Sequence, residues 1–441
     1  MPASDQQHIG VCLSGGGHRA SLFGLGALMY LIDADKGPDI AAVSSVSGGS
    51  LTNGWVALQT DITTVRPDEF TELASTLATR IARKGTLWAS KLTYLLLLAI
   101  AAPVIVAVWV SVAWGTPAAY VAWPIAIAVA AVVAQRRSWV ARRGFEQTLF
   151  HGEQLDAMHS TIDHLLCATD LQTSEAVYFS SRFVYSYRNG FGDTAGLHVA
   201  DAAQASAALP GAFPPVSMNA AKHGFRKPGA LTHFLLSDGG VYDNMGTEWL
   251  LRVTSGFRAD DNRPVRPPNT IDEAVVVNSS ASKGVVKRTL VRVPLIGELV
   301  TLLAVKDVLY DQTTAVRRRL LYLRSKVAAK APQMARDGLP CAIVQIGRSP
   351  FDTAGAYRRG SSPTSTRARD VIEALGDTEK EWDGIAAANA AVGTTLSKIP
   401  AERAAHLLRH AYVLTMAETH VLLGYPLRPV PTLETARSWL T

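Results

Sequence analysis

The sequence predicts an α/β fold in which a mainly parallel sheet is flanked by helices, with an inserted hydrophobic helical hairpin and a mostly helical C-terminal region. Two observations predict this fold class. Apolar strand segments alternate with helical segments, which is typical of βαβ units, and one long stretch of the chain is entirely uncharged. With 441 residues, the chain is long enough for one large domain with insertions or for several smaller units.

The N-terminal part alternates strand and helix. We predict an apolar strand at residues 8–13, then a glycine-rich turn, a helix at residues 20–32, a second strand at residues 40–46 and another helix after Gly48. Beyond the uncharged stretch we expect further strands and one alanine-rich helix, the strands at residues 176–187, 234–237, 274–278 and 341–346 and the helix at residues 199–209. Helical patterns at residues 306–329 and 379–420 make the C-terminal end mostly helical, and the Gly, Ser, Thr and Pro clustered at residues 358–369 predict an exposed loop.

The uncharged stretch, residues 92–135, contains no Asp, Glu, Lys, Arg or His. Its first part, residues 92–113, is long enough to cross a hydrocarbon core of about 30 Å at about 1.5 Å per residue. The second part, residues 118–134, is shorter, and the Trp-Gly-Thr-Pro between them predicts a turn. We therefore predict a transmembrane or re-entrant hairpin at residues 86–144. The alternative is a buried apolar helical pair or an active-site lid in a soluble protein, because prolines interrupt both parts.

Basic residues flank this hairpin on both sides, whereas its turn carries none. They are Arg83, Lys84, Lys91, Arg136, Arg137, Arg142 and Arg143. Because loops rich in Lys and Arg stay on the cytoplasmic side, we expect the catalytic part and both termini there. Residues 1–10 lack a basic segment followed by an apolar one, so we expect no secretory signal peptide.

The formal net charge of +6 and the pI of about 9.2 favour anionic partners such as phospholipid headgroups or nucleic acid. The sequence has no zinc-finger spacing, RNP signature or long Lys/Arg tract, so an anionic membrane surface is the stronger prediction and nucleic acid is not expected. The three cysteines, Cys12, Cys167 and Cys341, lie too far apart to predict a disulfide framework or a metal cluster.

A glycine-rich turn, Gly15, Gly16 and Gly17, joins the first strand to the first helix. Its amides at a helix N-terminus predict an anion site, either for a dinucleotide pyrophosphate or for the oxyanion formed when an ester carbonyl is attacked. The nucleotide interpretation is disfavoured because the second strand ends in Ser-Ser-Val-Ser-Gly-Gly instead of an acidic residue. His18 and Arg19 are expected to position this turn or a phosphate, or to lie exposed.

Ser47 follows the second strand and precedes Gly48, Gly49 and a helix, which is the strand-turn-helix context of a nucleophile elbow. Ser45 stands where that motif usually has its first glycine. The alternative is an ordinary Ser/Gly turn that caps a helix.

Asp238 ends an apolar strand and is followed by Gly239 and Gly240. Because the carboxyl ends of parallel strands share one edge of a sheet, Asp238 can meet Ser47 there and accept its proton. The alternative is a simple Asp-Gly turn. None of the eleven histidines lies in a comparable strand-end motif, so a histidine-containing triad is the minor mechanism.

Five segments in order resemble the patatin-like phospholipase family, which is related to cytosolic phospholipase A2. Residues 14–20 are similar to its oxyanion loop, residues 46–49 to its nucleophile turn and residues 238–240 to its base motif. Residues 167–171 with 175–179, and residues 205–216, are similar to segments that line and support the site. The resemblance covers residues 9–280 and treats the hairpin as an insertion. It implies a Ser47–Asp238 dyad, an oxyanion hole from the glycine-turn amides, an acyl-enzyme and no metal or cofactor. Ser45 and Ala20 replace family glycines with small residues.

The resulting hypothesis is a membrane-associated hydrolase of acyl esters in phospholipids or other glycerolipids. Its split catalytic domain occupies residues 1–85 and 145–357, and residues 358–441 form a C-terminal helical region. A transacylase or lysophospholipase with the same dyad, and a non-catalytic lipid-binding scaffold, are the alternatives. The headgroup, the acyl position and the oligomeric state are left open.

Overall fold

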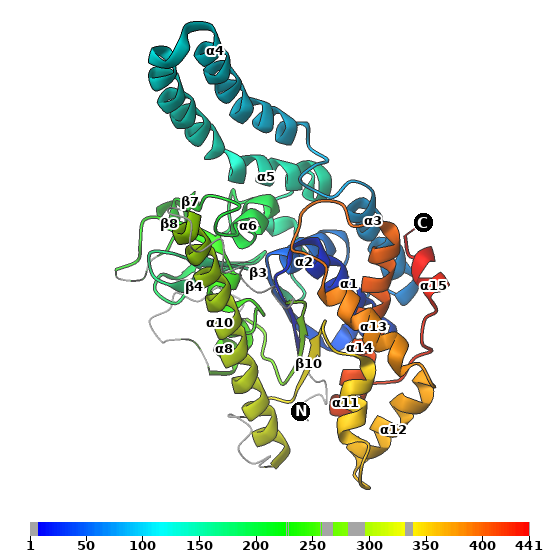
Figure 1. Ribbon diagram of the computed structural model, residues 1–441. Helices are drawn as coiled ribbons and strands as arrows, with labels where there is room; N and C mark the ends of the chain where they lie inside the picture. The colour runs from blue at the N-terminus through cyan, green and yellow to red at the C-terminus, as the bar shows by residue number, and fades with distance from the viewer. Residues whose placement is uncertain are drawn as a thin grey trace.

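The computed structural model describes residues 8–440 except 226, 228, 256, 258–267, 281–295 and 331–337 (Figure 1). Residues 1–7, part of the segment predicted to lack a signal peptide, lie outside the described residues. A ten-stranded mixed sheet forms the centre, and its strands are β1 (Ile9–Leu13), β2 (Ile40–Val46), β3 (Asp163–Asp170), β4 (Glu175–Phe179), β5 (Val184–Ser186), β6 (Gly190–Gly192), β7 (Val216–Met218), β8 (Phe234–Asp238), β9 (Glu273–Asn278) and β10 (Cys341–Gln345).

The sheet has a parallel half and an antiparallel half. Strands β10, β9, β1, β2 and β3 are neighbours in this order and pair in parallel. Strands β4, β5 and β6 continue the sheet as antiparallel neighbours, and β8 pairs antiparallel with β3 and β7. The parallel strands are apolar along most of their length because helices cover both faces.

Two hydrophobic cores lie on the two faces of the sheet. Alternate residues of one strand enter different cores, as Val11 and Cys12 of β1 do. The first core contains residues of α1 (Gly17–Asp33), α2 (Gly48–Gln59), α3 (Pro67–Arg83), α6 (Val199–Ser206), α11 (Pro350–Tyr357), α12 (Pro363–Leu375), α13 (Glu379–Ala390), α14 (Ala401–Leu423) and α15 (Leu433–Ser438). The second contains residues of α8 (Glu248–Ser255) and α10 (Ile296–Lys330). Together these layers confirm the predicted fold class.

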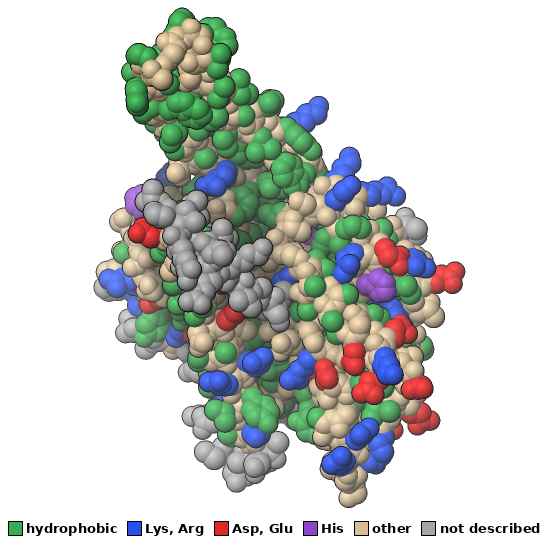
Figure 2. Space-filling model, viewed as in Figure 1, with side chains coloured by type: hydrophobic (Ala, Val, Ile, Leu, Met, Phe, Trp, Pro, Cys, Tyr) green, Lys and Arg blue, Asp and Glu red, His purple; other side chains and the backbone are tan. Residues whose placement is uncertain are grey.

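The predicted hairpin forms two helical arms within α4 (Lys91–Ala134), which reverse at Gly115, where φ is 76°. The arms project from the body of the molecule, and α5 (Arg137–Phe145) returns the chain to it (Figure 1). Hydrophobic side chains cover the projecting arms, and Lys and Arg side chains surround their base (Figure 2). Only 6% of the most apolar window is buried inside the molecule, so the arms are not the buried helical pair that the sequence left open.

Some local predictions were wrong. Residues 358–369 do not form one loop, because α12 begins at Pro363. The hydroxyl of Ser362 accepts a hydrogen bond from the amide of Ser365, and a serine followed by proline is a helix start signal. The strand-like run at residues 176–187 is a hairpin of β4 and β5, and the helical pattern at residues 379–420 is divided between α13 and α14.

The C-terminal helical region shares the first core with the N-terminal helices. Helix α14 packs along α1, and an ideal Cβ built on Gly26 of α1 would lie 2.4 Å from the carbonyl oxygen of Leu408. The ring of His410 makes an edge contact with that of Phe23 at 5.5 Å between centroids. Helix α14 therefore supports the helix that begins at the glycine turn.

Candidate active site

Ser47 lies in a sharp turn between β2 and α2. Its φ of 52° and ψ of −117° are unusual for a residue with a side chain, and this strain is characteristic of a nucleophile elbow. A Cβ on Gly48 would lie 2.0 Å from the carbonyl oxygen of Gly17, and one on Gly49 would lie 2.5 Å from that of Leu13. The two glycines therefore allow the serine turn and the glycine turn to touch.

A buried hydroxyl network supports the turn from below. The amide of Ser47 donates to Oγ of Ser206 at 2.9 Å, and that hydroxyl donates to the carbonyl oxygen of Cys167 at 2.6 Å. Ser45, which replaces the usual glycine, places its hydroxyl 3.1 Å from that of Ser50 and donates to Leu165 at 2.7 Å. The replacement of the usual glycine by Ser45 thus adds hydrogen bonds to the nucleophile turn.

Asp238 reaches the same edge of the sheet by a different route from the one predicted. Strand β8 is antiparallel to β3, so the argument from parallel strand ends was wrong for Asp238. Residues 163–167 of β3 pair with β2 and residues 168–170 pair with β8, while β4 occupies the other edge of β3. The carboxyl ends of β2 and β8 therefore approach each other head to head, which brings Ser47 and Asp238 to one place.

Helix α6 ties these two strand ends together. The carbonyl oxygen of Ser206 accepts a hydrogen bond from the amide of Gly239 at 3.1 Å, and that of Ala208 accepts one from the amide of Asp238 at 3.0 Å. The carboxylate of Asp238 in turn accepts a hydrogen bond from the amide of Gly240 at 2.8 Å. Ser206 contacts both turns, since its hydroxyl also binds Ser47.

Ser47 and Asp238 line one cavity of about 570 Å³. Both residues are buried but reach this space, Ser47 with 8% of its surface exposed. The volume of the cavity suits a medium-sized organic ligand. The other lining residues are Gly15, Gly16, Gly17, Arg19, Leu87, Trp88, Ala207, Leu209, Ala212, Phe213, Asn244, Ser280, Asp307, Tyr310, Asp311 and residues 390–397.

The amides of the glycine turn have different partners. The amide of Gly15 donates to the carbonyl oxygen of Asn244 at 3.0 Å, and that of His18 donates to Thr395 at 2.8 Å. Gly16 and Gly17 lie between them at the start of α1, where the first amides have no partner within the helix. Of the three amides predicted to bind an oxyanion, those of Gly16 and Gly17 are therefore better placed than that of Gly15.

His18 and Arg19 hold the turn in place. Nδ1 of His18 lies 2.7 Å from the carbonyl oxygen of Ser397, which can only accept, and Nε2 lies 3.0 Å from the hydroxyl of Thr86. Burial lowers the pKa of His18 to about 4, so the ring is neutral near pH 7. The guanidinium of Arg19 donates to the carbonyl oxygens of Ser279 and Val392, and burial lowers its pKa to about 10, which leaves it charged.

Sequence reasoning missed three parts of the cavity wall. Tyr310 and its neighbours come from α10, and residues 390–397 come from the C-terminal region. Leu87 and Trp88 lie at the start of the predicted hairpin, just before α4 begins at Lys91. Trp88 donates from its indole nitrogen to the hydroxyl of Ser397 at 2.7 Å, so the base of the hairpin is joined to this wall. No local motif marks these residues, although the helical spacing of Tyr310 and Arg317 could have placed both on one face of α10.

The fold is an α/β arrangement in which a strained serine turn, a glycine turn and an aspartate line one cavity. Residues 11–251 match the model of the family described as patatin-like phospholipase, which is more than half of the chain. The chain therefore belongs to the patatin-like phospholipase family, as the five motifs predicted. No curated protein matches it in sequence.

Solved structures with a similar arrangement are only distantly related in sequence. Human GIVD cytosolic phospholipase A2 is 12% identical with a TM-score of 0.45, over 98% of this chain and 61% of its own. VipD from Legionella pneumophila is 12% identical with a TM-score of 0.28, over 99% and 90%. ExoU from Pseudomonas aeruginosa, solved with SpcU, is 14% identical with a TM-score of 0.24, over 99% and 76%. The chain thus spans 61% of the length of the human phospholipase.

Proposed function

We propose that this protein is a membrane-associated serine hydrolase of acyl esters in phospholipids or other glycerolipids, with Ser47 as nucleophile and Asp238 as general base. The single observation that supports this best is that Ser47, Asp238 and the glycine turn line the same cavity. A carboxylate that serves as base for a serine needs such proximity, and an oxyanion needs amides at the same point.

In the proposed reaction, Oγ of Ser47 attacks the ester carbonyl carbon while Asp238 accepts the hydroxyl proton. The amides of Gly16 and Gly17 hold the negative oxygen of the tetrahedral intermediate. Collapse of this intermediate breaks the ester bond, and Asp238 returns the proton to the leaving alcohol. Asp238 then accepts a proton from the water that attacks the acyl-enzyme, and it returns this proton to Oγ of Ser47 as the fatty acid leaves.

The hairpin is proposed to hold the cavity at a bilayer. Leu87 and Trp88 lie both in the cavity wall and at the start of the hairpin, so an anchored hairpin would bring the cavity near the lipid surface. Arg142 and Arg143 form ion pairs with acidic residues that fix α5. Arg83, Lys84, Lys91 and Arg136 are exposed at the base and suit anionic headgroups. By the same charge bias, the catalytic part would face the cytoplasm.

The test is fatty-acid release from mixed phospholipid vesicles by the wild type, Ser47→Ala and Asp238→Asn. We expect each substitution to lower the rate by about a thousandfold or more, because loss of a nucleophile or base removes the chemical step. Ser361→Ala is the matched control, since Ser361 is exposed, lies just before α12 and does not line the cavity. Equal rates in the wild type and both dyad variants would refute the proposal. The same assay with glycerol or a lysolipid as acceptor separates hydrolysis from transacylation by its products.

A further inference from the structure

Helix α10 brings Tyr310 beside the proposed base. Tyr310 is buried and lines the cavity together with Asp238. A Cβ built on Gly240 would lie 2.6 Å from a ring carbon of Tyr310 and 2.9 Å from Oδ1 of Asp238. The tyrosine ring and the carboxylate therefore converge on one small space, which stays open because residue 240 is a glycine.

The protonation of Tyr310 suits it to donate a hydrogen bond. Burial raises the pKa of Tyr310 far above its usual value, and the charge of Asp238 raises that pKa further. The phenol therefore stays protonated, and a carboxylate beside it can only accept. A donor to an ionised carboxylate favours the ionised form, which is the form that a general base requires.

We propose that Tyr310 is a positioning residue whose hydroxyl donates a hydrogen bond to Asp238, and that an ion cluster around Arg317 holds Tyr310 in this place. The proposal rests on the proposed function, because it assigns Asp238 the role of base. It adds a third side chain to the site, from a helix that lies outside the recognised motifs.

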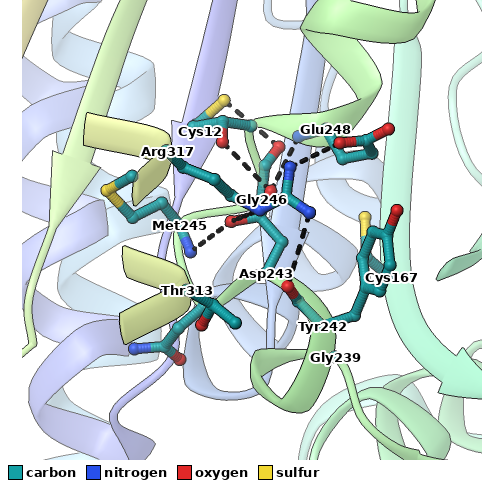
Figure 3. A network of polar contacts seen from close by, with 12 residues as sticks. Cys12, Cys167, Gly239, Tyr242, Asp243, Met245, Gly246, Glu248, Thr313 and Arg317 are labelled. Atoms are coloured by element: carbon teal, nitrogen blue, oxygen red, sulfur yellow. Dashed lines mark hydrogen bonds and ion pairs between the residues drawn. The ribbon is translucent and has the colours of Figure 1, made fainter. Parts of the chain in front are cut away.

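The ion cluster lies on the same face of α10. Arg317 follows Tyr310 by seven residues, which is two helical turns, and Thr314 and Leu321 extend this buried face. The guanidinium of Arg317 forms ion pairs with Asp243 at 3.5 Å and with Glu248 (Figure 3). It also lies over the ring of Tyr242 at 4.8 Å.

The acidic partners of Arg317 are themselves fixed to the segment that follows Asp238. Asp243 accepts hydrogen bonds from the amide of Met245 at 3.0 Å, the hydroxyl of Thr247 at 3.0 Å and the amide of Glu248 at 2.7 Å. Although burial alone would lower the pKa of Arg317, the charges of Asp243 and Glu248 raise it, so Arg317 stays charged. Residues 239–248 and α10 are thus joined as one unit around the base.

Other ionisable groups also face this space. Arg19 reaches the cavity from α1, and Asp307 and Asp311 reach it from α10. A substitution of Tyr310 leaves all three charges unchanged. A change in the pH dependence of activity after that substitution would therefore report the lost phenol.

The first experiment compares the pH profile of kcat/KM for wild type and Tyr310→Phe, with a short-chain soluble ester as substrate in detergent. We expect the acidic limb to move to higher pH by about one unit, because a hydrogen bond to a charged group is lost. Tyr322→Phe is the matched control, since Tyr322 lies on the same helix with 52% of its surface exposed, and its profile should equal that of the wild type. A uniform loss of rate in Tyr310→Phe with an unmoved limb would overturn the proposal.

The second experiment tests the ion cluster with Arg317→Gln and the double variant. If Arg317 acts through Tyr310, Arg317→Gln shifts the limb in the same direction and adds nothing to Tyr310→Phe. Additive shifts would mean that Arg317 does not act through Tyr310. Far-UV circular dichroism checks that both variants are folded. Arg317→Lys keeps the positive charge, so its acidic limb should lie between those of Arg317→Gln and the wild type. A wild-type rate in Ser47→Ala would refute the proposed function itself. If Ser47→Ala loses its activity as expected but the acidic limb of Tyr310→Phe does not move, only this inference is refuted.

Discussion

Two apolar helical pairs in this molecule have opposite surroundings. Helices α1 and α14 are packed together in the core, with Leu28 and Leu408 almost fully buried. The two arms of α4 are more apolar still, yet Val112 is 83% exposed and Tyr120 is 81% exposed. Hydrophobic composition alone therefore does not decide what covers a helix.

The two helical pairs differ in the number of polar residues that they carry. Helix α1 carries His18, Arg19 and Ser21, which all find hydrogen-bond partners inside the protein, and α14 carries His410 and Glu418. The arms of α4 carry no charge between residues 92 and 134. Exposed apolar surface costs about 25 cal/mol per Å² in water, so arms of this size need an apolar covering, which a bilayer would supply under the proposed function.

The test with the largest expected effect is to replace residues 91–134 with a Gly/Ser linker. We expect the shortened protein to leave the membrane fraction and to lose about a hundredfold or more of its rate on vesicle phospholipids, because the lipid is no longer at high effective concentration. Its rate on a soluble short-chain ester should stay close to that of the wild type. A shortened protein that stays in the membrane fraction at high salt, where electrostatic binding is screened, would show that another surface anchors it.

The second test compares truncations within the two pairs. Leu408→Ala should lower the free energy of unfolding by about 2–5 kcal/mol, since it leaves a cavity against α1. Ile105→Ala in the hairpin, which is 65% exposed, should change it by less than about 0.5 kcal/mol. Urea unfolding in detergent, followed by tryptophan fluorescence, measures both. Equal effects would mean that the hairpin unfolds as part of the core.

These contrasts also indicate how far the sequence could predict the structure. Strand β2 was predicted with its observed bounds, and the turn of the hairpin at Gly115 follows directly from Trp-Gly-Thr-Pro. Such features depend on local residue types. The positions of Ser47 and the glycine turn were predictable for the same reason, because strand, turn and helix are adjacent in sequence.

Features that depend on distant contacts were not predictable. The antiparallel direction of β8 depends on its pairing with residues 168–170 of β3, and no residue within β8 encodes it. Tyr310 lies 72 positions after Asp238, and the cluster that holds it joins Arg317 to Asp243. The wall formed by residues 390–397 likewise depends on the packing of α14 against α1.

Protonation of His410 should destabilise the buried pair in acid, whereas the arms of α4 carry no Asp, Glu or His. Glu418, on the same helix as His410, acts in the opposite direction because burial raises its pKa to about 7. Burial lowers the pKa of His410 to about 4, from an ordinary value of 6.5. The unfolded chain binds a proton first as the pH falls, so this stability is fully present above about pH 6.5 and is lost as the pH falls to about 4. The loss for His410 is about 3 kcal/mol.

Unfolding free energies at pH 7.5 and pH 4.5, for wild type and His410→Gln, measure this effect. The variant should be less stable at pH 7.5 but should lose less stability on acidification. His233→Gln is the control, because His233 is exposed, and it should follow the wild type. A wild-type pH dependence in His410→Gln would place the acid sensitivity elsewhere, for example at His18 or His164, whose pKa values burial also lowers.

The smallest expected effect concerns the basic residues at the base of the hairpin. In the protein that lacks residues 91–134, Arg136→Gln should weaken binding to anionic vesicles about fivefold, because each basic residue near such a surface contributes about 1 kcal/mol. Arg358→Gln is the control, since Arg358 is exposed but follows α11, away from the hairpin (Figure 1). Binding is measured by vesicle sedimentation at two salt concentrations, and screening should reduce the difference at high salt. Identical losses in both variants would mean that overall charge, and not the base of the hairpin, directs this protein to anionic lipid.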